Sequence, residues 1–208
     1  MPRRRGFPVE RFRAALRRRE RVSPARRAAF DARLMDAAAH PLGIVYTDTA
    51  DFTHRAARDG IVHFLMAFER AQRAVKPAIR ACGGRLVKVE ADSLLLVFPD
   101  AAAACRGVDG MERAIRSANR GRPDDESVIF SYGIGWGSVL DLEDDVFGLE
   151  VNLASKLGED LARPGEVLLT PAAAAALPRS LARRLDDYRQ VGFAGMPMRV
   201  QRLRPRTR

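Results

Sequence analysis

The chain has 208 residues, of which 47% are hydrophobic and 30% are charged, and its formal net charge is +10. This length and balance suit a globular domain with a full core and an appendage, and no stretch approaches the roughly 18 apolar residues of a membrane span. The N-terminal arginines are followed by no apolar segment, so we expect no secretory signal. The two cysteines, Cys82 and Cys105, lack metal-ligand spacing, which favours a reducing, cytoplasmic setting without a disulfide or zinc framework.

The positive charge is concentrated at the two ends of the chain. Residues 1–40 contain 12 arginines against four acids, and residues 199–208 add further arginines, while the body between them is near neutral. We therefore do not expect the body to bind nucleic acid. Residues 1–40 are predicted to form an Arg-rich helical extension. This extension either packs on the body or a dimer partner, or contacts an anionic lipid surface or nucleic acid.

The first half of the chain predicts a helix, a strand, a second helix and a hairpin. Ser23 is expected to cap a helix beginning at Pro24, which ends at residues 41–43, before a buried strand at residues 44–48. After residues 52–53, apolar residues at every third or fourth position predict one amphipathic helix that ends near Cys82. Two apolar runs then flank Glu90-Ala91-Asp92, which indicates a strand, a tight turn and a strand.

The second half continues this alternation. Asp100 is expected to cap an Ala-rich helix that runs toward Asn119, followed by a polar loop and an apolar central strand at residues 128–135. A short helix after Gly148, a strand at residues 167–169, a helix from Pro171 and two closing strands complete the chain. Strands that alternate with helices and hairpins predict an α+β fold with a mainly antiparallel sheet.

Two carboxylates are predicted to meet at adjacent strand ends. Asp48 ends the first core strand, and Asp92 lies in the turn of the hairpin. Two carboxylates placed side by side repel each other unless a divalent cation joins them. Oxygen-ligated Mg²⁺ or Mn²⁺ suits such a site.

Five short motifs follow one another along the chain. They are VYTDTADFT at residues 45–53, GGRLVKVEAD at 83–92, YGIGWG at 132–137, DVFGLEVNLASKL at 145–157 and PGEVLL at 164–169. In this order and spacing they resemble the catalytic domain of class III adenylate and guanylate cyclases, over about residues 42–203. The resemblance implies a ferredoxin-like βαββαβ core with additional C-terminal strands and a helix. It also implies that residues 41–208 are the catalytic domain with a short basic tail, acting as a head-to-tail homodimer with sites at the interface.

The resemblance implies an adenylate cyclase that converts ATP to 3′,5′-cyclic AMP and pyrophosphate. Asp48 and Asp92 would hold two Mg²⁺ or Mn²⁺ ions per site. Backbone N–H groups around Thr49, Phe52 and Thr53 would bind phosphate oxygens.

The opposite protomer would read the nucleobase. The resemblance assigns Lys88 and Asp145 to the adenine ring, as donor and acceptor respectively, and Asn152 to the ribose. Two positions depart from the family pattern. Lys156 stands where the family has a transition-state Arg and lacks its bidentate fork, and Ala194 replaces a triphosphate-binding Lys. We therefore expect weak or Mn²⁺-dependent activity.

Two alternatives stay open. The departures at Lys156 and Ala194 also fit a degenerate cyclase-homology module that binds a nucleotide or a partner without turnover. The chain could instead be a cyclase for another nucleotide, GTP, UTP or CTP. In addition, Glu90-Ala91 stands where the family usually has a turn Gly, which adds a third carboxylate near the predicted metals.

Overall fold

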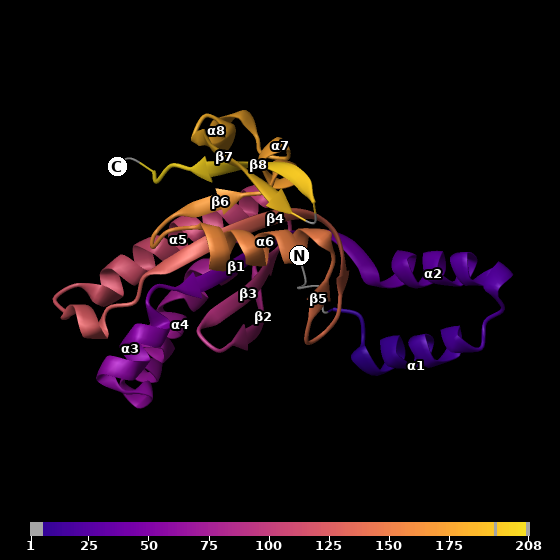
Figure 1. Ribbon diagram of the computed structural model, residues 1–208, viewed down its shortest axis with the longest axis horizontal. Coiled ribbons are helices and arrows are strands. Elements are labelled where there is room, and N and C mark those ends of the chain that lie inside the picture. Colours follow the sequence, from indigo (N-terminus) through magenta and orange to yellow (C-terminus); the bar gives the residue numbers. More distant parts are fainter. Residues whose placement is uncertain (1–5, 194, 207–208) are drawn as a thin grey trace.

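The structure is a computed structural model that describes residues 6–193 and 195–206. Figure 1 shows its helices and strands, which are α1 (Val9–Glu20), α2 (Pro24–Ala38), β1 (Ala39–Thr49), α3 (Phe52–Asp59), α4 (Ile61–Ala81), β2 (Arg85–Glu90), β3 (Ser93–Phe98), α5 (Ala101–Asn119), the 3₁₀ turn η1 (Asp124–Glu126), β4 (Phe130–Asp141), β5 (Val146–Phe147), α6 (Leu149–Lys156), the π-helix η2 (Leu157–Leu161), β6 (Val167–Leu169), α7 (Pro171–Ala175), α8 (Arg179–Ala182), β7 (Leu185–Phe193) and β8 (Met196–Leu203).

The described strands form one eight-stranded sheet. Its order is β2-β3-β1-β4-β6-β8-β7, with β5 paired to β4 off this path. The strands β1 to β4 with α3, α4 and α5 make a βαββαβ unit with spatial order β2-β3-β1-β4, which is the ferredoxin-like core. The pairing of β4 with β6 is parallel, whereas β1 pairs antiparallel with both β3 and β4. The predicted α+β fold, with its additional C-terminal strands and helix, is confirmed.

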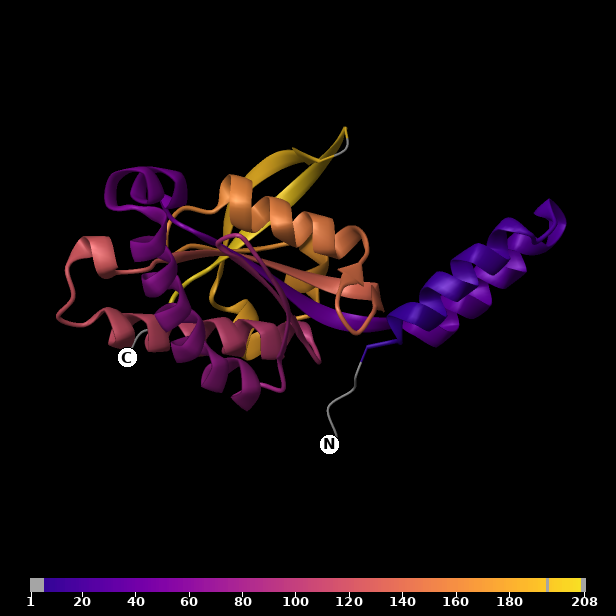
Figure 2. The same ribbon diagram turned by 90° about the horizontal axis from the view of Figure 1, so that it is seen from below.

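Helices cover both faces of the sheet (Figures 1 and 2). On one face lie α4 and α5, and a chain of aromatic rings joins α4 to β4. The rings are Phe64, Phe68, Phe130 and Tyr132, and the distances between successive ring centroids are 6.0, 6.2 and 6.1 Å. These four side chains are at most 2% exposed. Burial of one such ring contributes about 1.5–3 kcal/mol. This face therefore holds the larger core and fixes the central strands β1 and β4.

On the other face, α6 and η2 press directly against the sheet because glycines leave room for them. A Cβ atom added at Gly133 of β4 would lie 1.9 Å from the Ala154 carbonyl oxygen of α6. One added at Gly158 of η2 would lie 2.7 Å from the Tyr46 carbonyl oxygen of β1. Any larger side chain at these positions would push the helices off the strands. The glycines thus bring η2 next to the C-terminal end of β1.

Two predicted boundaries in the first half of the chain were wrong. The single helix expected after residues 52–53 is two helices, because Gly60 adopts a φ of 89° that no regular helix accommodates. The second of these helices, α4, includes Pro77 and ends at Ala81, close to the predicted end near Cys82. The first strand begins at Ala39 and includes Pro41, which has no β3 partner because pairing with β3 starts at Gly43. A proline is tolerated where a strand is open on one side.

The N-terminal helices α1 and α2 lie side by side and project from the body (Figures 1 and 2). Arg19 of α1 forms two hydrogen bonds with the Asp31 carboxylate of α2, at 2.5 and 2.7 Å. The main chain of Phe7 joins the end of β4 through a hydrogen bond to the Asp141 carbonyl oxygen at 2.6 Å. The two helices are Arg-rich, as expected, and α2 ends where β1 begins. The role of residues 1–40 as a separate unit stays a prediction. Along residues 6–193 and 195–206, the helices lack the combination of length and apolarity needed to cross a membrane.

Candidate functional site

The register of the sheet brings Asp48 and Asp92 to the same end of neighbouring strands. Thr47 of β1 stands opposite Leu94 of β3, so that the next residues along the two strands are Asp48 and Ser93. The Thr49 hydroxyl donates to the Asp92 carbonyl oxygen at 2.8 Å, and the Ser93 hydroxyl lies 3.5 Å from Asp48 Oδ1. These contacts tie the hairpin turn to the end of β1. The two acids that the sequence singled out therefore lie together, although their role as metal ligands stays a prediction.

Asp48 and Asp92 line a common open cavity of about 290 Å³. Its other lining residues are Thr49, Asp51, Phe52, Thr53 and His54. The cavity thus contains every residue predicted to bind phosphate. It is formed where β1 passes into α3.

The start of α3 lies at one end of this cavity. Asp51 precedes the helix in the left-handed region with φ of 60°, a conformation that Asp tolerates better than most residues. The ring of Phe52 packs edge-on against Phe64, with centroids 4.7 Å apart, and points into the core. The first N–H groups of a helix carry partial positive charge and have no partner within the helix. They are therefore suited to anionic oxygens at this end of the cavity.

Burial and neighbouring acids raise the pKa of both Asp48 and Asp92. Partial burial, the neighbouring Asp92 and then Glu159 raise the pKa of Asp48 to about 6, against the opposing effect of hydrogen bonds from Thr49 and Ser93. Burial, with a further contribution from Glu159, also raises the pKa of Asp92. Ionised carboxylates in this arrangement are unfavourable without a counter-charge. A divalent cation would supply that charge.

The donor set fits an open Mg²⁺ or Mn²⁺ site rather than a closed metal cage. Within the described ranges, no group of three or more His, Cys, Asp or Glu residues is arranged to hold a metal ion. Proteins commonly bind Mg²⁺ through one or two carboxylates, with substrate phosphates and water completing the octahedron. Asp48 and Asp92 match that pattern, because their cavity is open and already contains the predicted phosphate-binding main chain.

Sequence reasoning missed Glu159. This residue lies on η2, which Gly158 allows to approach Tyr46. Burial and then Glu159 raise the pKa of the Tyr46 hydroxyl, and the charge of Glu159 also acts on both Asp48 and Asp92. Local sequence patterns gave no signal for it, because its position depends on the close approach of Gly158 to Tyr46, which are far apart in the chain.

Lys88 and Asp145 meet in an ion pair on a different part of the surface. Lys88 Nζ lies 3.0 Å from Asp145 Oδ2 and 3.3 Å from Glu90 Oε1. Asp145 Oδ1 also accepts a hydrogen bond from the Val146 N–H at 2.8 Å. Partial burial lowers the pKa of Lys88, but hydrogen bonds with Asp145 and Glu90 outweigh it and raise the value overall. The two predicted base-reading residues are thus adjacent, and neither lines the cavity of Asp48.

Asn152 and Lys156 lie on the outer face of α6. The side chain of Asn152 is exposed, while Val151 and Ala154 point into the core. Lys156 Nζ forms an ion pair with Asp160 Oδ2 at 3.0 Å, one helical turn away. Neither Asn152 nor Lys156 lines the cavity of Asp48 within one chain. Ala194 lies outside the described residues.

One curated protein is similar in sequence. No family model matches the chain. The chain is 27% identical over 127 residues to "Putative adenylate cyclase 3" of Rhizobium meliloti (strain 1021), a match that covers 61% of this chain. It spans only 22% of the length of that relative. The sequence similarity therefore concerns one part of a much longer protein.

Solved structures share the fold over most of the chain. The adenylate/guanylate cyclase/hydrolase of Silicibacter pomeroyi superposes with a TM-score of 0.69 at 22% identity, covering 81% of this chain and 98% of that one. The non-canonical dimeric guanylyl cyclase domain of the RhoGC fusion protein of Blastocladiella emersonii gives a TM-score of 0.65 at 17% identity, covering 81% of this chain and 99% of that one. The resemblance seen in the sequence motifs is thus confirmed, and this chain has the fold of the class III adenylate and guanylate cyclase catalytic domain.

Proposed function

We propose that this chain is an adenylate cyclase that converts ATP into 3′,5′-cyclic AMP and pyrophosphate at the interface of a homodimer. The observation that carries the proposal is the meeting of Asp48 and Asp92 in one open cavity beside the start of α3. The sequence similarity to "Putative adenylate cyclase 3" of Rhizobium meliloti (strain 1021) supports it.

In this proposal Asp48 and Asp92 hold two Mg²⁺ or Mn²⁺ ions. Such ions, when bound, favour loss of the proton from the ribose 3′-hydroxyl and neutralise charge on the triphosphate. The main-chain N–H groups at the start of α3 bind the phosphate oxygens, with the helix dipole adding to the attraction. The Thr49 hydroxyl donates to the Asp92 main-chain carbonyl oxygen at 2.8 Å, which keeps the hairpin turn beside the end of β1.

The partner protomer supplies the groups that select the base. Lys88 donates to adenine N1, and Asp145 accepts from the 6-amino group. Guanine carries an N1–H and a 6-carbonyl, so both contacts would be mispaired, at a cost of about 1–3 kcal/mol for each unsatisfied buried group. The 3.0 Å contact between Lys88 and Asp145 supports this role because it holds donor and acceptor side by side before the nucleotide binds. Asn152 orients the ribose and Lys156 stabilises charge on the reacting phosphate.

The test is a product assay with ATP, GTP, UTP and CTP, each with Mg²⁺ and with Mn²⁺. The expected result is cyclic AMP from ATP, lost at least about a hundredfold in Asp48→Asn and in Asp92→Asn. Asp124→Asn, an exposed acid on η1, is the matched control and should keep the parent activity. Absence of any cyclic product from the parent, or equal activity in all variants, would refute the proposal. A preference for another nucleotide would refute the roles of Lys88 and Asp145.

A binding module without turnover is the second candidate. The observation that favours it is the ion pair of Lys156 with Asp160. This pair engages the cation at the expected transition-state position, and a lysine there offers a compact charge in place of an Arg fork. Calorimetry with ATP and Mn²⁺, run beside chromatography of the same samples, separates the two candidates. Saturable binding without product selects the module, whereas turnover removes it.

A further inference from the structure

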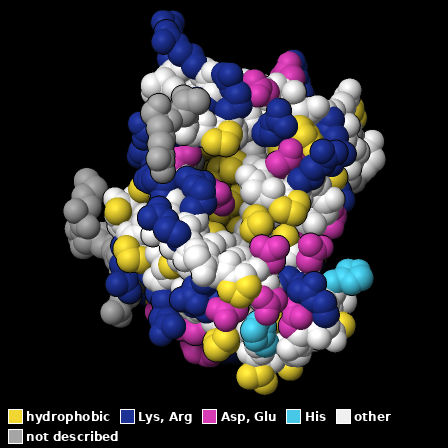
Figure 3. Space-filling model, turned by 90° about the vertical axis from the view of Figure 1, so that its left-hand side faces the viewer, with side chains coloured by type: hydrophobic (Ala, Val, Ile, Leu, Met, Phe, Trp, Pro, Cys, Tyr) yellow, Lys and Arg dark blue, Asp and Glu magenta, His cyan; other side chains and the backbone are white. Residues whose placement is uncertain are grey.

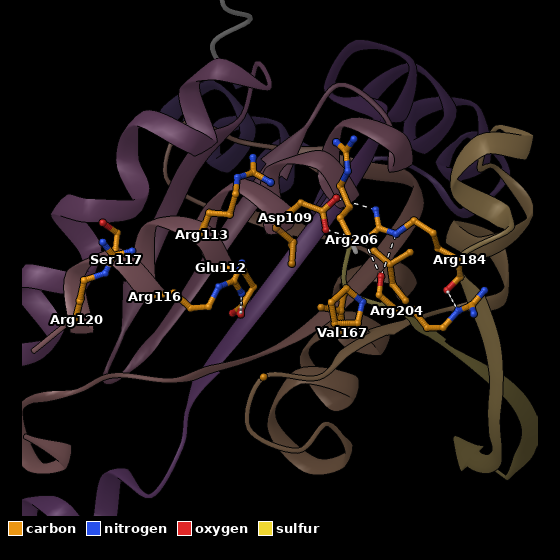
Figure 4. A pocket seen from close by; sticks show the side chains of 14 residues that line it. Asp109, Glu112, Arg113, Arg116, Ser117, Arg120, Val167, Arg184, Arg204 and Arg206 are labelled. Carbon is orange, nitrogen blue, oxygen red and sulfur yellow. Dashed lines mark hydrogen bonds and ion pairs between the residues drawn. The ribbon is translucent and has the colours of Figure 1, made fainter. Parts of the chain in front are cut away.

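A second cavity lies between α5 and the C-terminal segment (Figure 4). Its volume is about 690 Å³, more than twice that of the Asp48 cavity, and the two share no lining residue. Six arginines line it, which are Arg113, Arg116, Arg120, Arg184, Arg204 and Arg206. Arg113 and Arg116 lie on α5 and Arg120 directly follows it, while the other three come from the chain after β6 (Figure 4). On the face seen in Figure 3, Lys and Arg side chains gather in the upper and left parts.

Only two acids line this cavity, and both are already engaged. Asp109 receives two hydrogen bonds from the Arg184 guanidinium, both at 2.7 Å, and the two side chains are only 11% and 16% exposed. Glu112 accepts from the Tyr132 hydroxyl at 2.8 Å and from Arg116 at 3.2 Å. Six arginines against two acids leave a formal excess of four positive charges in the lining.

Three of the arginines make no hydrogen bond or ion pair within residues 6–193 and 195–206. This holds for the side chains of Arg113, Arg120 and Arg206, whereas the Arg120 main-chain N–H bonds to the Ser117 carbonyl oxygen. Arg113 is exposed on α5 and Arg120 is exposed directly after its last residue, and spacings of three and four residues put both on the same side as Arg116. The C-terminal end of α5 carries a partial negative charge of about half a unit. That charge is smaller than the excess of four, so the cavity attracts anions.

The floor of the cavity is apolar where Val108, Val167 and Leu203 contribute to it. Guanidinium groups match the oxygens of a phosphate in a bidentate fork, and sites of about 300–1000 Å³ hold small molecules. We propose that this cavity binds a small phosphate-bearing anion at a site separate from the Asp48 cavity. The anion is either inorganic, held by charge alone, or an organic phosphate whose apolar part rests on the floor.

The experiment is calorimetric titration of the full chain with inorganic pyrophosphate and, separately, with adenosine 5′-monophosphate, in buffer containing EDTA. All proteins carry Asp48→Asn and Asp92→Asn, so that the result is independent of the proposed cyclase site. Saturable binding is expected, and Arg113→Ala with Arg120→Ala should weaken it about tenfold or more. Tighter binding of the nucleotide than of pyrophosphate identifies an organic ligand, and the reverse order identifies an inorganic one.

The matched control removes two arginines from another surface. Arg73→Ala with Arg80→Ala changes two exposed side chains of α4 and the same amount of charge. This control should bind both probes as the parent does. An equal loss in the control, no saturation with either probe, or an unchanged affinity after loss of Arg113 and Arg120 would overturn the proposal. Tighter binding of a short RNA that is lost in the same variant would also overturn it, in favour of a nucleic-acid surface.

Discussion

Replacing Asp48 with Asn is expected to stabilise the metal-free chain at neutral pH while removing the proposed activity. Burial and the nearby carboxylates raise the pKa of Asp48 from 3.8 to about 6. The folded chain therefore binds this proton more tightly than the unfolded chain does, and ionisation at higher pH costs stability. The difference corresponds to about 3 kcal/mol, which solvent screening of a half-buried carboxyl reduces to about 1–2 kcal/mol. Asn has the same shape without the charge and escapes this cost.

The assay is thermal unfolding of the parent and of Asp48→Asn in EDTA between about pH 3 and pH 8. At pH 7 the variant should melt about 2–8 °C higher. The gap should close as the pH falls below about 4, where the parent carboxyl is protonated in both states, because the penalty arises only as the pH rises through the two pKa values.

Addition of Mn²⁺ should raise the melting temperature of the parent and leave the variant unchanged, since binding to the folded state alone stabilises it. A variant that is less stable than the parent at pH 7, or a gap that does not vary with pH, would contradict the account of repelling carboxylates at this site.

Three further changes test other parts of the site. Ala91→Gly should raise the free energy of unfolding, measured by urea denaturation, by about 0.5–1 kcal/mol, because Ala91 holds a φ of 48° that Gly adopts without strain; a lower free energy of unfolding would contradict this account of the turn. Lys88→Ala should reduce the ratio of kcat/KM for ATP to that for GTP about tenfold. The control Lys76→Ala on α4 should leave this ratio unchanged. An unchanged ratio in Lys88→Ala would show that Lys88 does not select the base. Lys156→Arg should raise kcat about tenfold with little change in KM, since the guanidinium fork contacts two phosphate oxygens, and a kcat no higher than the parent's would show that this position does not limit turnover.

Local sequence patterns were sufficient for much of the fold. The hairpin follows from two apolar runs around Glu90-Ala91-Asp92, and the Asp100 cap was predicted and is present as a 2.6 Å hydrogen bond from the Ala103 N–H. The sequence could predict that Asp48 and Asp92 lie together, because Asp48 ends one recognisable strand and Asp92 lies in the turn before another. These features depend on neighbours within a few residues, which is the range over which propensity, capping and alternation act.

Tertiary packing decided the contacts between residues far apart in the chain. Lys88 and Asp145 are 57 positions apart, and their 3.0 Å contact depends on the sheet register and on the loop before β5. The charge of Glu159 acts on Asp48 and Asp92 because Gly158 lets η2 pack closely against Tyr46.

The arginine cavity likewise exists only after the C-terminal segment folds back beside α5. The sequence by itself determined the strands, the turns and the two acids at their ends. Only the tertiary structure decided which distant charges lie in the same cavity. Such contacts depend on strand register and on close approach of the backbone, and local sequence patterns contain no information about either.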